Sequence, residues 1–260
     1  MTPANLIYVT RSDAKMMNAN PLLSEALTAV EREQRTPQAE LTLQLPDVLA
    51  RTAALFAITV VTAVAGWVAL PANGFTMLVL PLAAFGVAMW AFFRKTINAS
   101  LPLLFAVLEG AVVGVISRVF AERYGSDIVV TAVLATAVVF AVCLVVYRIP
   151  RVRNSTQGRR VFLVLLISYL VFSFLSLGAG VFFGVGDGWG FFGLGLLGIA
   201  VAAFAIALSA WSLIVNFGDT ERAIVGGAPV AYAWLLSLGL LISTVWLYLS
   251  ILRFLGLVRR

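Results

Sequence analysis

The stretch from residue 101 to residue 123, LPLLFAVLEGAVVGVISRVFAER, is apolar and long enough to cross a bilayer as a helix. It carries one acid, Glu109, near its middle, where a charge is costly and by default marks a functional site. The competing interpretation is a protonated Glu109 that only hydrogen-bonds a neighbouring helix. Gly110 and Gly114 form a GxxxG motif, which predicts close packing against another helix.

The composition of the chain extends this interpretation to the whole protein. Of the 260 residues, 62% are hydrophobic and 12% are charged. Soluble domains average about 45–50% apolar and about 25% charged residues, so a soluble fold could not bury this much apolar surface. The sequence therefore predicts an all-α, polytopic membrane protein.

Seven apolar runs reach the length of about 20 residues that a helical span needs. They lie near 48–70, 74–93, 99–121, 127–147, 160–184, 190–217 and 229–257. The last break between runs extends from Asp219 to Pro229. We therefore expect a transmembrane domain over residues 47–260, after a polar tail over residues 1–46. Within the tail, Asn20-Pro21 predicts the start of a short amphipathic helix.

The distribution of Lys and Arg predicts the orientation. These residues gather in the tail and in the even-numbered connections, above all in the fourth, which places the N-terminus in the cytoplasm. We expect the membrane to be the cell membrane. Seven spans then put the C-terminus outside, although it ends in Arg259-Arg260. We favour a full crossing of the last run over a re-entrant one, because that run is long enough.

Several function classes conflict with the residue inventory. The chain has no histidine, which removes HExxH zinc sites and histidine-based nucleophile systems, and its lone Cys143 forms no internal disulfide. Without paired intramembrane acids we expect no enzyme. The net charge of +6 sits at the ends of apolar runs rather than on a basic helix, so we expect no nucleic-acid partner.

The sixth run carries a polar stripe. Its members recur every three or four residues and fall within an arc of about 100° on a helix; they are Ser209, Ser212, Asn216, Asp219 and Thr220. Single hydroxyls of this kind are ordinary helix-packing groups. The stripe as a whole favours a face directed to the protein interior or to a hydrated path.

Three segments together resemble a known family. They are LEGAVVGVISRVFAERY, the following GSDIVVTAVLATAVVFAVCLVVYR, and NFGDTERAIVGGAPVAYAWLLSLGLLISTVWLYLSILR near the C-terminus. In order and spacing they are similar to the bacterial branch of the Bax inhibitor-1 (YccA-like) family, over nearly the whole chain from about residue 18. The resemblance implies a seven-helix bundle whose last helix is central. It also implies a pH-dependent calcium leak, gated by two acids that share a proton.

The chain departs from that family pattern at the acids. The resemblance implies acids where Asn216, Gly218 and Ser250 stand. Asp219 lies one helical turn from Asn216 on the same face and could substitute for it. The pairs Glu221-Arg222 and Glu109-Gly110 match the family.

These observations leave two functional hypotheses. The first is passive permeation of cations such as Ca²⁺ along Glu109, Asn216, Asp219 and Ser250, with Glu221 and Arg222 at the cytoplasmic mouth. Three acids offer oxygen ligands for at most weak calcium binding, and we expect no other cofactor. The alternative is a non-conducting binding partner of another membrane complex, such as a membrane protease, which the long polar tail and the missing acids favour.

Overall fold

The computed structural model describes residues 42–94, 98–149, 156–185, 190–193 and 195–259. Leu43–Arg260 form one compact unit. The short helix predicted after Asn20 lies outside the described residues, as does most of the polar tail.

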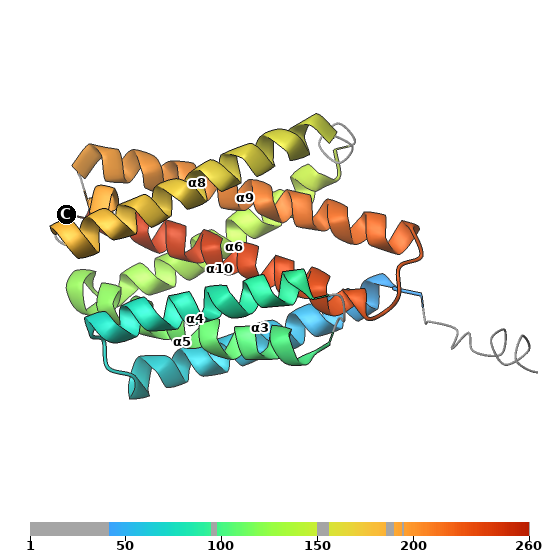
Figure 1. Ribbon diagram of the computed structural model, residues 1–260, viewed down its shortest axis with the longest axis horizontal. Coiled ribbons are helices and arrows are strands. Elements are labelled where there is room, and N and C mark those ends of the chain that lie inside the picture. The colour runs from blue at the N-terminus through green and yellow to red at the C-terminus, as the bar shows by residue number, and fades with distance from the viewer. Residues whose placement is uncertain (1–41, 95–97, 150–155, 186–189, 194, 260) are drawn as a thin grey trace, which may run out of the picture. The chain divides into compact units, whose positions relative to one another are not determined.

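Seven helices in the described residues are long and apolar enough to cross a membrane, which confirms the predicted seven-span, all-α architecture (Figure 1). They are α3 (Leu45–Ala69), α4 (Gly74–Phe93), α5 (Ser100–Tyr124), α6 (Asp127–Tyr147), α8 (Thr156–Phe183), α9 (Gly195–Val225) and α10 (Tyr232–Val258). A short 3-10 turn, η1 (Gly190–Gly193), precedes α9. The chain is a multi-pass membrane protein.

Local sequence signals account for several helix ends. At the start of α3, the Asp47 carboxylate accepts a hydrogen bond of 3.0 Å from the backbone N–H of Gln44. At the start of α4, the Asn73 side chain accepts a hydrogen bond of 2.8 Å from the backbone N–H of Thr76. α5 ends at Gly125, whose φ of 95° is accessible to glycine.

The sixth span differs from its predicted limits at both ends. α9 starts at Gly195 rather than near residue 190, because residues 190–193 form η1. It continues to Val225, through the stretch after Asp219 that we predicted to be a break. Polar residues support the helix there, since Asp219 pairs with Arg222 one turn on and the Thr220 hydroxyl bonds the carbonyl of Asn216. The chain turns only at Gly226-Gly227.

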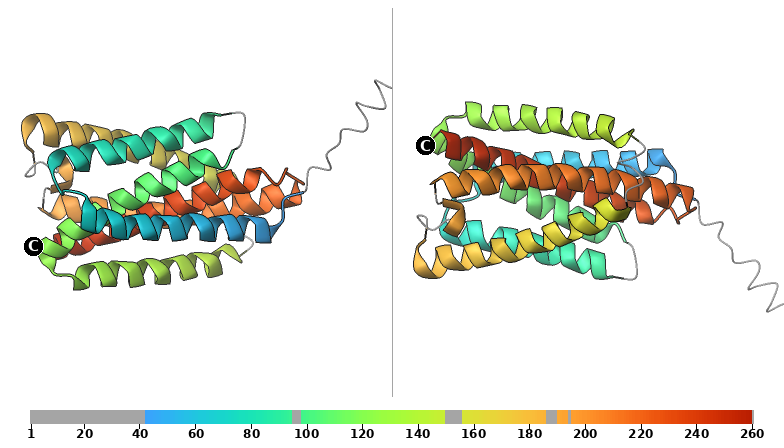
Figure 2. Two further views of the ribbon diagram at one scale, coloured as in Figure 1. Left: turned by 90° about the horizontal axis from the view of Figure 1, so that it is seen from below. Right: turned by 90° about the horizontal axis from the view of Figure 1, so that it is seen from above.

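The core of the bundle surrounds α10. This last helix is the most buried of the seven spans, as predicted, and it packs chiefly against α3, α5, α6 and α9 (Figures 1 and 2). Leucine side chains of α10, among them Leu238, Leu241 and Leu247, are completely buried. The outward faces of the other helices carry exposed valine, leucine and phenylalanine side chains, as a surface in contact with lipid requires.

Candidate functional site

Glu109 lies on the face of α5 that meets the central helix. Phe105, one turn before it, belongs to a buried cluster with Leu238 and Leu241 of α10, and Val113, one turn after it, packs against the same cluster. Because residues four apart share a helix face, the Glu109 side chain lies on this interior side of α5. It is half-buried.

No partner for the Glu109 carboxyl group occurs among the described residues, where it makes neither a hydrogen bond nor an ion pair. The side chains one turn away are apolar. A charged carboxylate in such surroundings is costly, so the group is protonated or is accompanied by a cation.

The GxxxG residues bring α5 against α3. A Cβ added at Gly110 would lie 1.9 Å from Thr62 Oγ1, and one at Gly114 would lie 2.0 Å from the carbonyl oxygen of Ala63. Hydroxyls of α3 reinforce the contact, since Thr59 Oγ1 donates to the carbonyl of Ala106 over 3.3 Å. This packing fixes the rotation of α5 and therefore the direction of Glu109.

The polar stripe of α9 forms a seam with α10. Asn216 Nδ2 donates to Ser243 Oγ over 2.6 Å and to the carbonyl of Gly239 over 3.2 Å. Ser212 Oγ lies 2.7 Å from Ser243 Oγ. We call Ser212, Asn216, Ser243 and the Gly239 carbonyl the α9–α10 seam. It is neutral, and its side chains are hydrogen-bonded to one another.

The other two positions where the resemblance implies an acid, Ser250 and Gly218, are also neutral. Ser250 is buried in α10, and its hydroxyl donates to the Trp246 carbonyl of its own helix over 2.7 Å. Gly218 is buried beneath Tyr147 and Arg222, each 3.7 Å from the position that a Cβ would take. No hydrogen bond joins Glu109 to Asn216 or Ser250 within the part of the chain that the structure describes.

The acids at the C-terminal end of α9 are already engaged. Asp219 pairs with Arg222, and Arg159 of α8 lies 3.5 Å from the same oxygen. Glu221 accepts a hydrogen bond from the Tyr147 hydroxyl of α6. Arg159 and Tyr147 were not predicted as site residues, because nothing in the local sequence indicates that α6 and α8 meet α9 here.

The acids in the described part of the chain do not gather into a metal centre. No group of three acids, histidines or cysteines that could hold a metal ion occurs among the described residues. A lone carboxylate such as Glu109 can contact a passing cation but provides only part of the six to eight oxygen ligands that Ca²⁺ takes.

A family model with the description Bax inhibitor 1 like matches residues 20–260 of the chain. No protein with a curated description matches it.

Proposed function

This chain belongs to the Bax inhibitor 1 like family, and from that premise we propose that it lets cations, Ca²⁺ among them, permeate passively through its helix bundle. The observation that carries the proposal is the acid Glu109, which lies on the inner face of α5 without a partner among the described residues. In this proposal Glu109 takes the role that the family resemblance assigns to a pair of acids on the last two helices.

The chemistry of the site supports permeation rather than tight binding. A cation that passes Glu109 would relieve the cost of its charge, and carboxylate oxygen suits hard cations. Because Glu109 is the one acid at that level among the described residues, the cation would be held weakly and could leave again. Hydroxyl and amide oxygens of Ser212, Asn216 and Ser243 would offer ligands if the α9–α10 seam opened.

We also propose that the N-terminus is cytoplasmic, on the distribution of Lys and Arg. The C-terminal end of α9, with Asp219, Glu221 and Arg222, then faces the cytoplasm. Both acids there already have partners, so their attraction for cations is reduced.

The test is calcium and proton flux into proteoliposomes that hold the purified protein, at acidic and at neutral pH. Glu109→Gln removes the charge and keeps the shape, and should lower flux by about tenfold or more, because a passing cation loses the carboxylate that offsets its own cost inside the apolar bundle. Glu122→Gln is the matched control, because Glu122 lies on the same helix in an exposed pair with Arg118. Equal flux in Glu109→Gln and wild type would overturn the proposed role of Glu109.

A second candidate function is a non-conducting binding partner of another membrane complex, such as a membrane protease. The observation that favours it is the neutral, hydrogen-bonded α9–α10 seam, which includes one of the positions where the resemblance implies an acid. Wild-type flux no greater than that of empty liposomes at any pH would favour this candidate. Deletion of residues 1–40 should then abolish capture of the partner, and capture that survives the deletion would count against it.

A further inference from the structure

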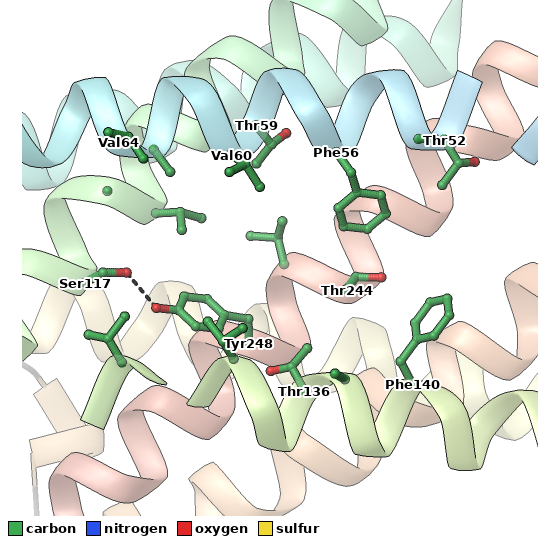
Figure 3. Close-up of a pocket in the computed structure, with 18 of the residues that line it drawn as sticks. Thr52, Phe56, Thr59, Val60, Val64, Ser117, Thr136, Phe140, Thr244 and Tyr248 are labelled. Atoms are coloured by element: carbon green, nitrogen blue, oxygen red, sulfur yellow. Dashed lines mark hydrogen bonds between the residues drawn. The ribbon is translucent and has the colours of Figure 1, made fainter. Parts of the chain in front are cut away.

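A cavity of about 950 Å³ opens on the side of the bundle between α3 and α6 (Figure 3). These two helices both pack against α10 and α5, but they barely contact each other. Along α3, the lining extends from Leu49 to Trp67, which is about 27 Å at 1.5 Å per residue. The groove therefore follows most of the membrane thickness. We call it the α3–α6 groove.

The walls of the groove are almost entirely apolar. Valine, alanine and phenylalanine side chains form most of the lining. The hydroxyls among them are largely paired within the protein. For example, Thr136 and Thr244 each bond a carbonyl of their own helix, and Ser117 Oγ lies 2.7 Å from the Tyr248 hydroxyl. Such a surface fits a hydrocarbon chain rather than water.

Thr52 is the exception at one end of the groove. Its hydroxyl oxygen is buried and has no hydrogen-bond partner within the described residues. The carbonyl one turn before it, that of Val48, already accepts a bond from Ser237 of α10. An unpaired hydroxyl at this depth is costly. Because Thr52 lines the groove, a rotation of its side chain would let an ester or hydroxyl oxygen of a ligand supply the missing partner.

The size of the groove distinguishes between two possible occupants, a partner's transmembrane helix and a narrower apolar molecule. A transmembrane helix about 10 Å wide and about 30 Å long encloses about 2,400 Å³, well above the volume available. A volume of about 950 Å³ lies in the range of pockets that enclose small molecules. An elongated, narrow and apolar molecule therefore fits better than a partner's helix.

Arg148 follows α6 at the end of the bundle where α3 and the Thr52 end of the groove begin (Figure 1). Thr52 and Phe140 lie at the same end in Figure 3, and α6 ends two turns beyond Phe140 at Arg148. The start of α3 and the end of α6 are at the same end of the bundle (Figures 1 and 2). Arg148 is exposed and has no ion pair with any described residue. Basic positions between transmembrane helices bind anionic lipid headgroups.

We propose that the α3–α6 groove is a binding site for an anionic phospholipid. The acyl chain lies along α3 toward Ser117 and Tyr248, the glycerol ester accepts the Thr52 hydrogen bond, and the phosphate headgroup lies at Arg148. Because Thr244 and Tyr248 line the groove, the bound lipid contacts the central helix directly. The site does not depend on whether the protein conducts ions.

The experiment uses the full chain in nanodiscs that contain a photoactivatable phosphatidylglycerol, with phosphatidylcholine of the same acyl chains as the comparison. Crosslinked peptides are mapped by mass spectrometry. We expect phosphatidylglycerol to label the groove-lining parts of α3 and α6 in preference to their outward faces. Arg148→Gln should reduce this labelling by about fivefold, the effect of one arginine near an anionic headgroup.

Two matched controls separate the site from ordinary lipid contact. Val60→Trp fills the groove, whereas Val61→Trp alters the neighbouring lipid-facing position; the two valines are 60% and 68% exposed, so neither change disturbs the core. Labelling should be lost only in Val60→Trp. Arg160→Gln removes another exposed arginine without an ion pair among the described residues, and should leave labelling unchanged.

Three results would overturn the proposal. Equal labelling of groove and outward faces would mean ordinary annular lipid. Equal labelling by phosphatidylglycerol and phosphatidylcholine would remove the anionic headgroup from the assignment. A groove that stays unlabelled while the outward faces react would indicate that a protein helix covers it.

Discussion

α5 and α9 both pack against the central helix α10 and both bond it through polar side chains, as Ser117 of α5 bonds Tyr248, yet the acid of α5 differs in its pairing from the polar residues of α9. On α9, Ser212 and Asn216 bond Ser243 and the backbone of α10. On α5, Glu109 has no partner among the described residues. A row of several polar residues can thus be a packing seam, whereas a single unpaired acid is the stronger candidate for a site. The substitutions below alter residues of these two faces or the contacts that hold the helices in place.

The largest effect should come from breaking the packing that orients Glu109. Gly114→Leu places a side chain where the Ala63 carbonyl oxygen lies 2.0 Å from the Cβ position. Because the obstacle is backbone, α3 and α5 must separate, and we expect a loss of about 3 kcal/mol or more. Thermal unfolding in detergent should show a large fall in Tm, or no folded protein at all.

Gly86→Leu on α4 is the control for that substitution. No atom lies within 4 Å of the Cβ position at Gly86. The variant should unfold near the wild-type temperature. Equal behaviour of the two variants would mean that the α3–α5 contact does not fix α5.

The next substitution places an acid on the α10-facing side of α9, as Glu109 stands on α5. Asn216→Asp replaces the Nδ2 donor with an oxygen that faces the Gly239 carbonyl and Ser243. The hydrogen bond to the Gly239 carbonyl is lost and two acceptors are left facing each other there, whereas the Ser243 hydroxyl can still donate to the carboxylate, so we expect destabilisation of about 1–3 kcal/mol. The fall in Tm of the purified variant measures it.

Asn73→Asp is the matched control, because the Asn73 side chain acts there as an acceptor at the start of α4, a role that aspartate fills equally well. Its Tm should be unchanged. If Asn216→Asp were equally neutral, the α9–α10 seam would not depend on the donor, and the contrast with α5 would weaken.

The sequence predicted the spans well and the contacts between them poorly. Helix number and approximate limits follow from length and apolarity, which are local properties. Polarity alone misplaced the end of α9, because a helix continues through polar residues when they pair one turn apart, as Asp219 and Arg222 do. The central place of α10 came from the family resemblance rather than from its own residues.

The partners of the candidate site residues could not be predicted. Tyr147 and Glu221 are 74 positions apart, and Ser117 and Tyr248 are 131 apart. These pairs depend on which helices become neighbours, and apolar periodicity does not specify that. Glu109 was identifiable because an intramembrane acid is rare, whereas its lack of a partner among the described residues becomes visible only in the folded bundle.

A smaller effect should follow from loosening the α9–α10 seam without adding charge. Ser243→Ala removes the hydroxyl that contacts both Ser212 and Asn216. Interhelical hydrogen bonds in membranes average about 0.6 kcal/mol and reach about 1.7 kcal/mol. We expect a modest fall in Tm. Ser168→Ala should show none, because its exposed hydroxyl bonds only its own helix, and an equal fall in both would contradict the seam.

The smallest effect concerns the end of α10 beside α5, where Arg259 pairs with Asp127 over 2.7 Å and donates to the Tyr124 carbonyl. The hydrogen bond to Asp127 raises the pKa of Arg259 above its already high ordinary value. A raised pKa stabilises the fold below the unfolded-state value, so the arginine contributes equally at mildly acidic and mildly basic pH. Arg259→Gln should therefore lower Tm only slightly, and by the same amount at mildly acidic and at mildly basic pH. This fall in Tm should shrink in high salt, because exposed ion pairs are screened. If the fall in Tm persisted in high salt, the hydrogen bond to the Tyr124 carbonyl, rather than the ion pair with Asp127, would be what holds the end of α10 against α5.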